Sequence, residues 1–190
     1  MFTTNGGMRQ SLKIHPDSLS SAATHIDVDV APHAGSLVLS YIVTGKISHL
    51  RIPSAMAAAR TDELWRHTCF EAFVRTSPDE SYYEFNFSPS SKWAAYHFSG
   101  YRSGMRVATE IGPPVVQTQA NAASYTLQVL LKLALLPSLP GAAPWRLGLS
   151  AVIEETSGRK SYWALAHPPG KPDFHRLDCF TYEFSPASPP

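Results

Sequence analysis

The chain has 190 residues, of which 44% are hydrophobic, 16% are charged and 11% are aromatic. This size and aromatic content fit one folded domain with its own core and exclude a disordered chain. The formal net charge of +1, without a run of Lys or Arg, argues against nucleic-acid binding.

The N-terminus contains no apolar stretch of the length that a secretion signal needs. No later segment approaches the roughly 18 apolar residues of a membrane span. We therefore expect a cytoplasmic protein that does not bind membranes. Two cysteines, Cys69 and Cys179, are too few for a disulfide framework, and the sequence leaves open whether they pair.

The N-terminal part of the chain alternates between apolar and polar residues, which is typical of strands. Residues 25–30 and 36–45 predict a hairpin around a turn at 31–35. Residues 48–53 predict another short strand that ends at a proline. Residues 54–65 fit one helical turn or a loop.

The remainder continues in short segments separated by prolines and glycines. Residues 68–75 and 81–89 are rich in aromatic residues and predict a second hairpin across a Pro-Asp turn. Residues 124–140 fit a strand or a short helix. The proline-rich segment 167–176 predicts a rigid loop that frames a pocket. Further strands are expected at residues 92–102, 145–155 and 160–167.

These segments amount to about nine to eleven strands, spaced as in an all-β sandwich. We expect a single antiparallel domain over residues 10–184, with flexible tails at 1–9 and 185–190.

Side-chain alternation within the second predicted hairpin places polar groups together. Glu71 should emerge on the same surface as Glu84 and Asn86 of the next strand, and Trp65 stands just ahead of that surface. Carboxylates and amides bind hydroxyl groups, and flat aromatic rings pack against the C–H face of a sugar. The pattern therefore predicts a saccharide site, with Trp163 as a second aromatic platform.

The segments "LWRHTCFEAFV" and "YYEFNFSPSSKWAAYHFSGYR" resemble the DOMON-like superfamily, and in particular a stand-alone bacterial group of it. That superfamily includes the family 9 carbohydrate-binding modules and the haem-binding domain of cellobiose dehydrogenase. The specific match covers residues 62–102. The resemblance implies an immunoglobulin-like or jelly-roll β-sandwich that binds its ligand on one sheet and the adjoining loops, without catalysis.

The resemblance also implies roles for individual residues. Trp65 and Trp163 correspond to aromatic platforms of the sugar-binding modules, Glu71 to a hydroxyl-binding carboxylate, and Asn86 to a ligand-binding amide. Glu84 departs from the pattern, because those modules place an arginine there.

Other interpretations of the same residues remain open. Arg66 or Arg102 could bind an anionic group of the ligand, whereas Glu71 could be a structural ion-pair partner and Trp65 a plug at the end of the sandwich. No His or Cys spacing predicts a metal site. Two further classes are a protein-interaction module and a haem carrier. The candidate axial ligands of a haem are Met56, Met105, His67, His97 and His167.

Overall fold

The computed structural model describes residues 2, 7–33, 36–133, 136, 139 and 144–185. The described residues form β1 (Met8–Ile14), β2 (Ala23–His33), β3 (Ser36–Gly45), η1 (Ile47–His49), β4 (Ala59–Arg60), η2 (Leu64–Arg66), β5 (Cys69–Thr76), β6 (Tyr82–Phe87), β7 (Lys92–Phe98), β8 (Arg106–Val107), β9 (Val115–Ala120), β10 (Ser124–Leu131), β11 (Trp145–Glu154), β12 (Lys160–Ala164), η3 (Leu177–Cys179) and β13 (Tyr182–Phe184). None of the helices in this part of the chain has the length and apolar character that crossing a membrane requires.

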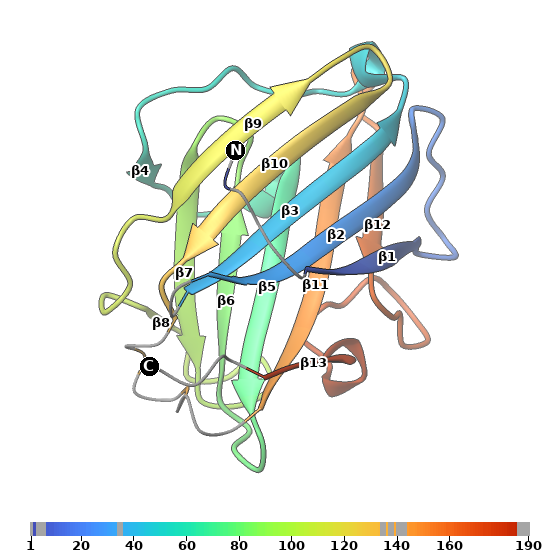
Figure 1. Ribbon diagram of the computed structural model, residues 1–190. Coiled ribbons are helices and arrows are strands. Elements are labelled where there is room, and N and C mark those ends of the chain that lie inside the picture. Colours follow the sequence, from blue (N-terminus) through green and yellow to red (C-terminus); the bar gives the residue numbers. More distant parts are fainter. Residues whose placement is uncertain are drawn as a thin grey trace.

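The thirteen strands of the described residues form one continuous sheet in the order β4-β7-β6-β5-β11-β12-β1-β2-β3-β10-β9, with β8 paired to β7 and β13 to β11. The sheet curls on itself, so that β9, β10, β3 and β2 lie in front of β7, β6, β5 and β11 (Figure 1). Strand β1 joins the two halves, because its first part pairs with β2 and its end pairs with β12. The all-β prediction is confirmed. The prediction of a β-sandwich is not confirmed, because the described strands form a single curled half-barrel.

The core lies between the two halves of the curled sheet. Alternation turns one face of β2 and one face of β3 inward, and the apolar residues of these faces belong to the same core as Phe70, Phe85 and Leu149 of the opposite half. The buried Tyr41 hydroxyl donates a hydrogen bond of 2.7 Å to the backbone oxygen of Glu71. The inner face of β5 is therefore tied to the core, and its outer face is left for other contacts.

Both predicted hairpins are confirmed, β2 with β3 and β5 with β6. The segment 124–140 fitted either a strand or a short helix, and its residues 124–131 form strand β10. The strand predicted at residues 48–53 is wrong, because η1 and an isolated bridge at Leu50 occupy that region.

The predicted flexible tails differ from the structure at the N-terminus. Met8 and Arg9 pair with Val30 and Asp29 in β2, and the Arg9 side chain forms an ion pair of 2.7 Å with Asp29. These two residues therefore belong to the sheet. In the predicted C-terminal tail, residues 186–190 lie outside the described residues.

Gly45 ends β3 in a conformation that only glycine adopts readily. Its φ is +146°, and a Cβ atom there would lie 2.0 Å from the backbone oxygen of Ala22. We expect Gly45→Ala to lower the free energy of unfolding by about 3 kcal/mol, because backbone would have to move. Thermal denaturation followed by circular dichroism measures this. Gly158→Ala is the control: its φ is +85°, but no atom lies within 4 Å of the added Cβ, so a loss of only about 1 kcal/mol is expected. Equal losses would contradict the clash.

Candidate functional site

A cleft of about 520 Å³ lies on the outer face of the half-sheet formed by β7, β6, β5, β11 and β12. This face is the one turned away from the core, and it carries a second apolar cluster that includes Phe73, Tyr82 and Val152. The segments 101–105 and 172–175 and the short helix η2 contribute the remaining walls. The lining residues are Trp65, Glu71, Glu84, Tyr96, Phe98, Arg102, Met105, Val152, Tyr162, Pro172, Phe174 and His175.

Aromatic side chains stand at both ends of the cleft. Trp65 in η2 is 41% exposed and meets the Tyr96 ring of β7 edge-on, with 6.4 Å between the ring centroids. At the other end, Tyr162 of β12 packs against Phe174 with a centroid distance of 6.4 Å. Strands β6, β5 and β11 lie between β7 and β12, so the two ends are about 19 Å apart along the sheet. This arrangement offers apolar surface to both ends of an elongated ligand.

Strands β5 and β6 form the floor of the cleft between these ends, and they carry the carboxyl groups of Glu71 and Glu84. Glu71 of β5 pairs in register with Asn86 of β6, and Glu84 lies two residues along β6 on the same face. Each has one close hydrogen-bond donor. The Ser150 hydroxyl donates to Oε2 of Glu71 over 3.3 Å, and the Asn86 amide donates to Oε1 of Glu84 over 2.7 Å.

Burial makes both groups difficult to ionise, since Glu71 is 3% and Glu84 6% exposed. Burial, reinforced by the negative charge of Glu84, raises the pKa of Glu71 to about 8. Burial raises the pKa of Glu84 to about 7, although the Asn86 hydrogen bond and Arg102 act in the opposite direction. At neutral pH the carboxyl groups of Glu71 and Glu84 therefore keep at least one proton between them.

The two other buried glutamates at the end of β11 have the partners that a structural carboxylate needs. Glu154 forms an ion pair with Arg51 at 3.0 Å, and its other carboxylate oxygen lies 2.8 Å from Nδ1 of His67, within hydrogen-bond distance. Glu155 accepts hydrogen bonds from two backbone amides and from serine hydroxyls of the segment 20–22. Burial raises the pKa of Glu155, but these hydrogen bonds outweigh it and lower the pKa overall. Glu71 and Glu84 have fewer partners among the described residues: one hydrogen-bond donor each, and the His175 imidazole at 3.8 Å from Glu84.

Arg102 reaches the cleft from the loop after β7, and its ion pair with Asp173 holds it there. The carboxylate of Asp173 accepts a hydrogen bond of 2.8 Å from Nη2 of Arg102 and further hydrogen bonds from the Tyr101 hydroxyl and the backbone amide of His175. Burial opposes ionisation of Asp173, but the Tyr101 and Arg102 hydrogen bonds dominate and lower its pKa. Two loops whose contacting residues are 71 positions apart in sequence are thereby joined over the floor.

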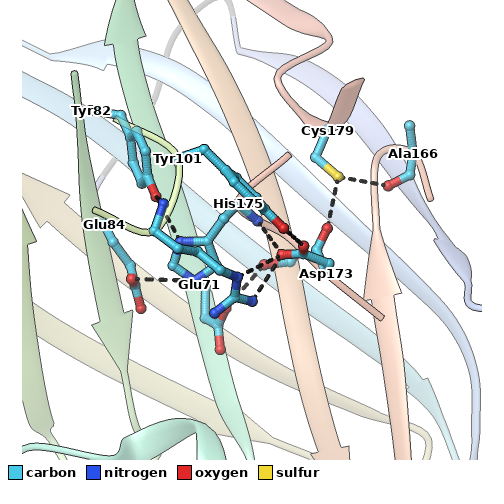
Figure 2. A network of polar contacts seen from close by, with 10 residues as sticks. Glu71, Tyr82, Glu84, Tyr101, Ala166, Asp173, His175 and Cys179 are labelled. Atoms are coloured by element: carbon cyan, nitrogen blue, oxygen red, sulfur yellow. Dashed lines mark hydrogen bonds and ion pairs between the residues drawn. The ribbon is translucent and has the colours of Figure 1, made fainter. Parts of the chain in front are cut away.

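His175 connects this loop network to the carboxyl groups. The Tyr82 oxygen accepts from the backbone amide of Arg102 over 3.2 Å, so its own proton is available to Nδ1 of His175, 2.8 Å away. Nε2 of His175 then faces Oε2 of Glu84 at 3.8 Å (Figure 2). Burial and the charge of Arg102 lower the pKa of His175 to about 4. The imidazole is therefore neutral at neutral pH and leaves the carboxyl charge uncompensated.

Of the residues predicted from the sequence, the structure brings Trp65, Glu71, Glu84 and Arg102 together in the cleft. Asn86 is fully buried beneath the floor, where its amide supports Glu84.

Besides Asn86, two further predicted residues are not part of the cleft lining. The exposed side chain of Arg66 pairs with Glu63 at 2.8 Å. Trp163 faces the core, where its indole N–H donates to the Ser161 hydroxyl over 2.9 Å, so the prediction of a second platform at this position is wrong. Its neighbour Tyr162 occupies the cleft face of β12 instead.

Sequence reasoning missed the cleft residues contributed by β7, β11 and the long C-terminal loop. Tyr96 and Val152 lie in strands whose sequence carries no signal that sets them apart from core residues. The loop 167–176 was expected to frame a pocket, and the structure confirms this by placing Pro172, Phe174 and His175 in the lining. The proline-rich sequence was the available signal for this part of the wall.

The residues considered for other cofactors lie apart. Met105 lines the cleft, but His67 binds Glu154, His97 packs against Tyr83, and His167 contacts the backbone oxygen of Lys13. Within the described residues no group of three or more His, Cys, Asp or Glu side chains could hold a metal ion. Haem binding stays an untested alternative.

Cys69 and Cys179 are both buried free thiols, so the two cysteines do not pair. The Cys69 thiol lies 3.5 Å from the side-chain oxygen of Asn86, below the floor of the cleft. Cys179 contacts the backbone oxygens of Ala166 and Asp173 at 3.4 and 3.3 Å. Its contacts fasten the start and the middle of the C-terminal loop.

No family model matches the sequence, and no curated protein sequence is significantly similar to it. A proposed carbohydrate-binding protein from Bacteroides uniformis ATCC 8492 shares the fold with a TM-score of 0.67 at 16% identity, over 92% of this chain and 84% of that chain. A family 9 carbohydrate-binding module from Caldicellulosiruptor kristjanssonii, in complex with cellotriose, gives a TM-score of 0.51 at 11% identity, over 86% of this chain and 75% of that chain. At these identities the likeness is one of fold.

Proposed function

We propose that the chain is a non-catalytic saccharide-binding domain of the DOMON-like type and that the outer cleft is its ligand site. The observation that carries this proposal is the combination of aromatic ends with a polar, buried floor. Trp65 and Tyr162 offer ring faces at opposite ends, and Glu71 and Glu84 offer hydrogen-bonding groups between them. This is the chemistry that a sugar ring needs, because its two surfaces are apolar and its rim is polar.

The dimensions of the cleft support a small elongated ligand. Its volume of about 520 Å³ lies within the range of about 300–1,000 Å³ that is usual for small-molecule sites. A short oligosaccharide laid across the strands would reach from the Trp65 end to the Tyr162 end. The carbohydrate-binding designations of the two structural neighbours are consistent with such a ligand.

We propose binding without hydrolysis. A glycosidase places its two carboxyl groups on either side of the bond that it cleaves. Glu71 and Glu84 instead lie next to each other on adjacent strands of one floor. Incubation with oligosaccharides should therefore release no reducing ends, and a steady release that depends on Glu71 would contradict the proposal.

Trp65→Ala tests the aromatic platform. We expect the variant to bind cellotriose about tenfold more weakly than the wild type in isothermal titration calorimetry, because a stacking face worth about 1.4 kcal/mol is lost. Trp163→Phe is the matched control, since its side chain lies in the core: it should lower thermal stability and leave the affinity unchanged. Weaker binding by Trp163→Phe together with unchanged binding by Trp65→Ala would contradict the site assignment.

A further inference from the structure

We propose that the cleft selects saccharides that carry a protonated amine and that their ammonium group binds between Glu71 and Glu84. This inference rests on the proposed function, and it names the class of saccharide. The geometry that supports it is a pair of buried carboxyl groups which face an open cleft and have no cationic partner within the described residues.

The contacts of each carboxyl group show that no Lys or Arg of the described residues pairs with it. Among the described residues, no hydrogen-bond donor reaches Oε1 of Glu71, and no Lys or Arg forms an ion pair with Glu71 or Glu84. The imidazole of His175 lies near Glu84, but it is held neutral by burial. A buried carboxylate without a cation is costly, so a site of this kind gains from a ligand that supplies one.

The cation already present in the cleft has another partner. Arg102 directs both Nε and Nη2 at Oδ1 of Asp173, at 3.3 and 2.8 Å. The charge of Arg102 also lowers the pKa of Glu71 and of Glu84, but its ion pair is with Asp173, so two carboxylate charges in the floor exceed what one shared cation balances when both are ionised. An ammonium group would restore the balance, whereas a hydroxyl group would leave the repulsion between the two carboxylates in place.

An ammonium group also fits the donor count and the walls. It offers three N–H donors, which allows one to each carboxylate, while a sugar hydroxyl offers one. Charge-assisted hydrogen bonds are about twice as strong as neutral ones. The rings of Trp65 and Tyr96 stand beside the floor, and aromatic faces attract cations as well as sugar C–H groups.

Three β-1,4-linked trisaccharides that differ only at C2 provide the test: the glucosamine trimer with a free amine, its N-acetylated counterpart, and cellotriose. Calorimetry near neutral pH should give about tenfold tighter binding for the amine than for either neutral trimer. That preference should weaken as salt is added, because salt screens charge.

The double variant E71Q/E84Q tests whether these two carboxyl groups cause the preference for the amine. Glutamine keeps the shape of each side chain but carries no charge, so the ratio of the affinity for the amine to the affinity for cellotriose should fall from about ten to about one, whatever the change in cellotriose affinity itself. E110Q is the charge-matched control, because Glu110 pairs with Arg106 outside the cleft; its preference should be unchanged.

The outcomes separate this inference from the proposed function. Equal binding of the three trimers, or a preference that survives in E71Q/E84Q, would overturn the amine assignment and leave the saccharide site standing. Binding of none of the three trimers would overturn both. Tighter binding of the amine in wild type and E110Q, lost in E71Q/E84Q, supports the assignment.

Discussion

The E71Q/E84Q double variant should be more stable than the wild type in alkaline solution, by several kcal/mol at about pH 8.5. Both carboxyl groups are buried, and their pKa values are raised to about 8 and about 7. In the unfolded chain a glutamate ionises near its ordinary value of about 4.3. Between that pH and about 8 the unfolded state therefore releases protons that the folded state retains.

The sign of this effect follows from the raised pKa values. Below about pH 4 both states bind the protons, so the two groups have no effect on stability. As the pH rises from about 4.3 to the folded pKa values, the unfolded chain ionises while the buried groups keep their protons, so the free energy of unfolding falls until both buried groups are ionised. Glutamine cannot ionise, so the gap between variant and wild type should widen from about pH 5 to about pH 8.5.

Urea denaturation of both proteins at several pH values measures the gap. E110Q serves again as the control and should behave oppositely, because hydrogen bonds from Arg106 lower the pKa of Glu110 to about 2 and its charge therefore stabilises the fold. A constant difference between E71Q/E84Q and the wild type across this pH range would show that the two carboxyl groups ionise as freely as exposed ones.

Replacing Glu155 should have the reverse consequence. Glu155→Ala removes a buried carboxylate that accepts from the backbone amides of Ser21 and Ala22 and from the Ser21 hydroxyl, and it leaves those donors without partners. We expect a loss of about 3 kcal/mol near neutral pH. Because the pKa of Glu155 is lowered on folding, its contribution is present above the unfolded pKa of about 4.3 and disappears as the pH falls through the folded value.

The matched control for Glu155→Ala is Glu183→Ala in β13. Glu183 forms an ion pair of 2.9 Å with Arg146, but both side chains are about half exposed. A surface pair of this kind contributes less than about 1 kcal/mol. Chemical denaturation should therefore separate the two variants by about 2 kcal/mol or more. If Glu155→Ala lost no more stability than Glu183→Ala, the hydrogen bonds to the segment 20–22 would not hold the loop as we describe.

Together these variants distinguish two uses of buried charge in one small fold. Glu154 and Glu155 have protein partners and stabilise the sheet, whereas Glu71 and Glu84 destabilise it and face a cleft. Functional sites often carry such a cost in stability. The contrast supports a ligand role for Glu71 and Glu84 without reference to any relative.

The sequence by itself determined the features that depend on local alternation. Within one hairpin, a short turn sets the register and side chains alternate between the two faces. The common face of Glu71, Glu84 and Asn86 could therefore be predicted from the sequence. The inward faces of β2 and β3 followed from the same rule. The all-β class followed from many short segments that are separated by turn-forming residues.

Tertiary structure alone decided which face of each distant strand meets the cleft. Strand β12 has an aromatic residue on both faces, Tyr162 and Trp163, so alternation could not say which one points to the core. The joining of Arg102 to Asp173, and of Tyr82 to His175, brings together segments separated by 71 and 93 residues. Such contacts depend on how the sheet curls and on where the C-terminal loop returns, and no local period in the chain encodes either.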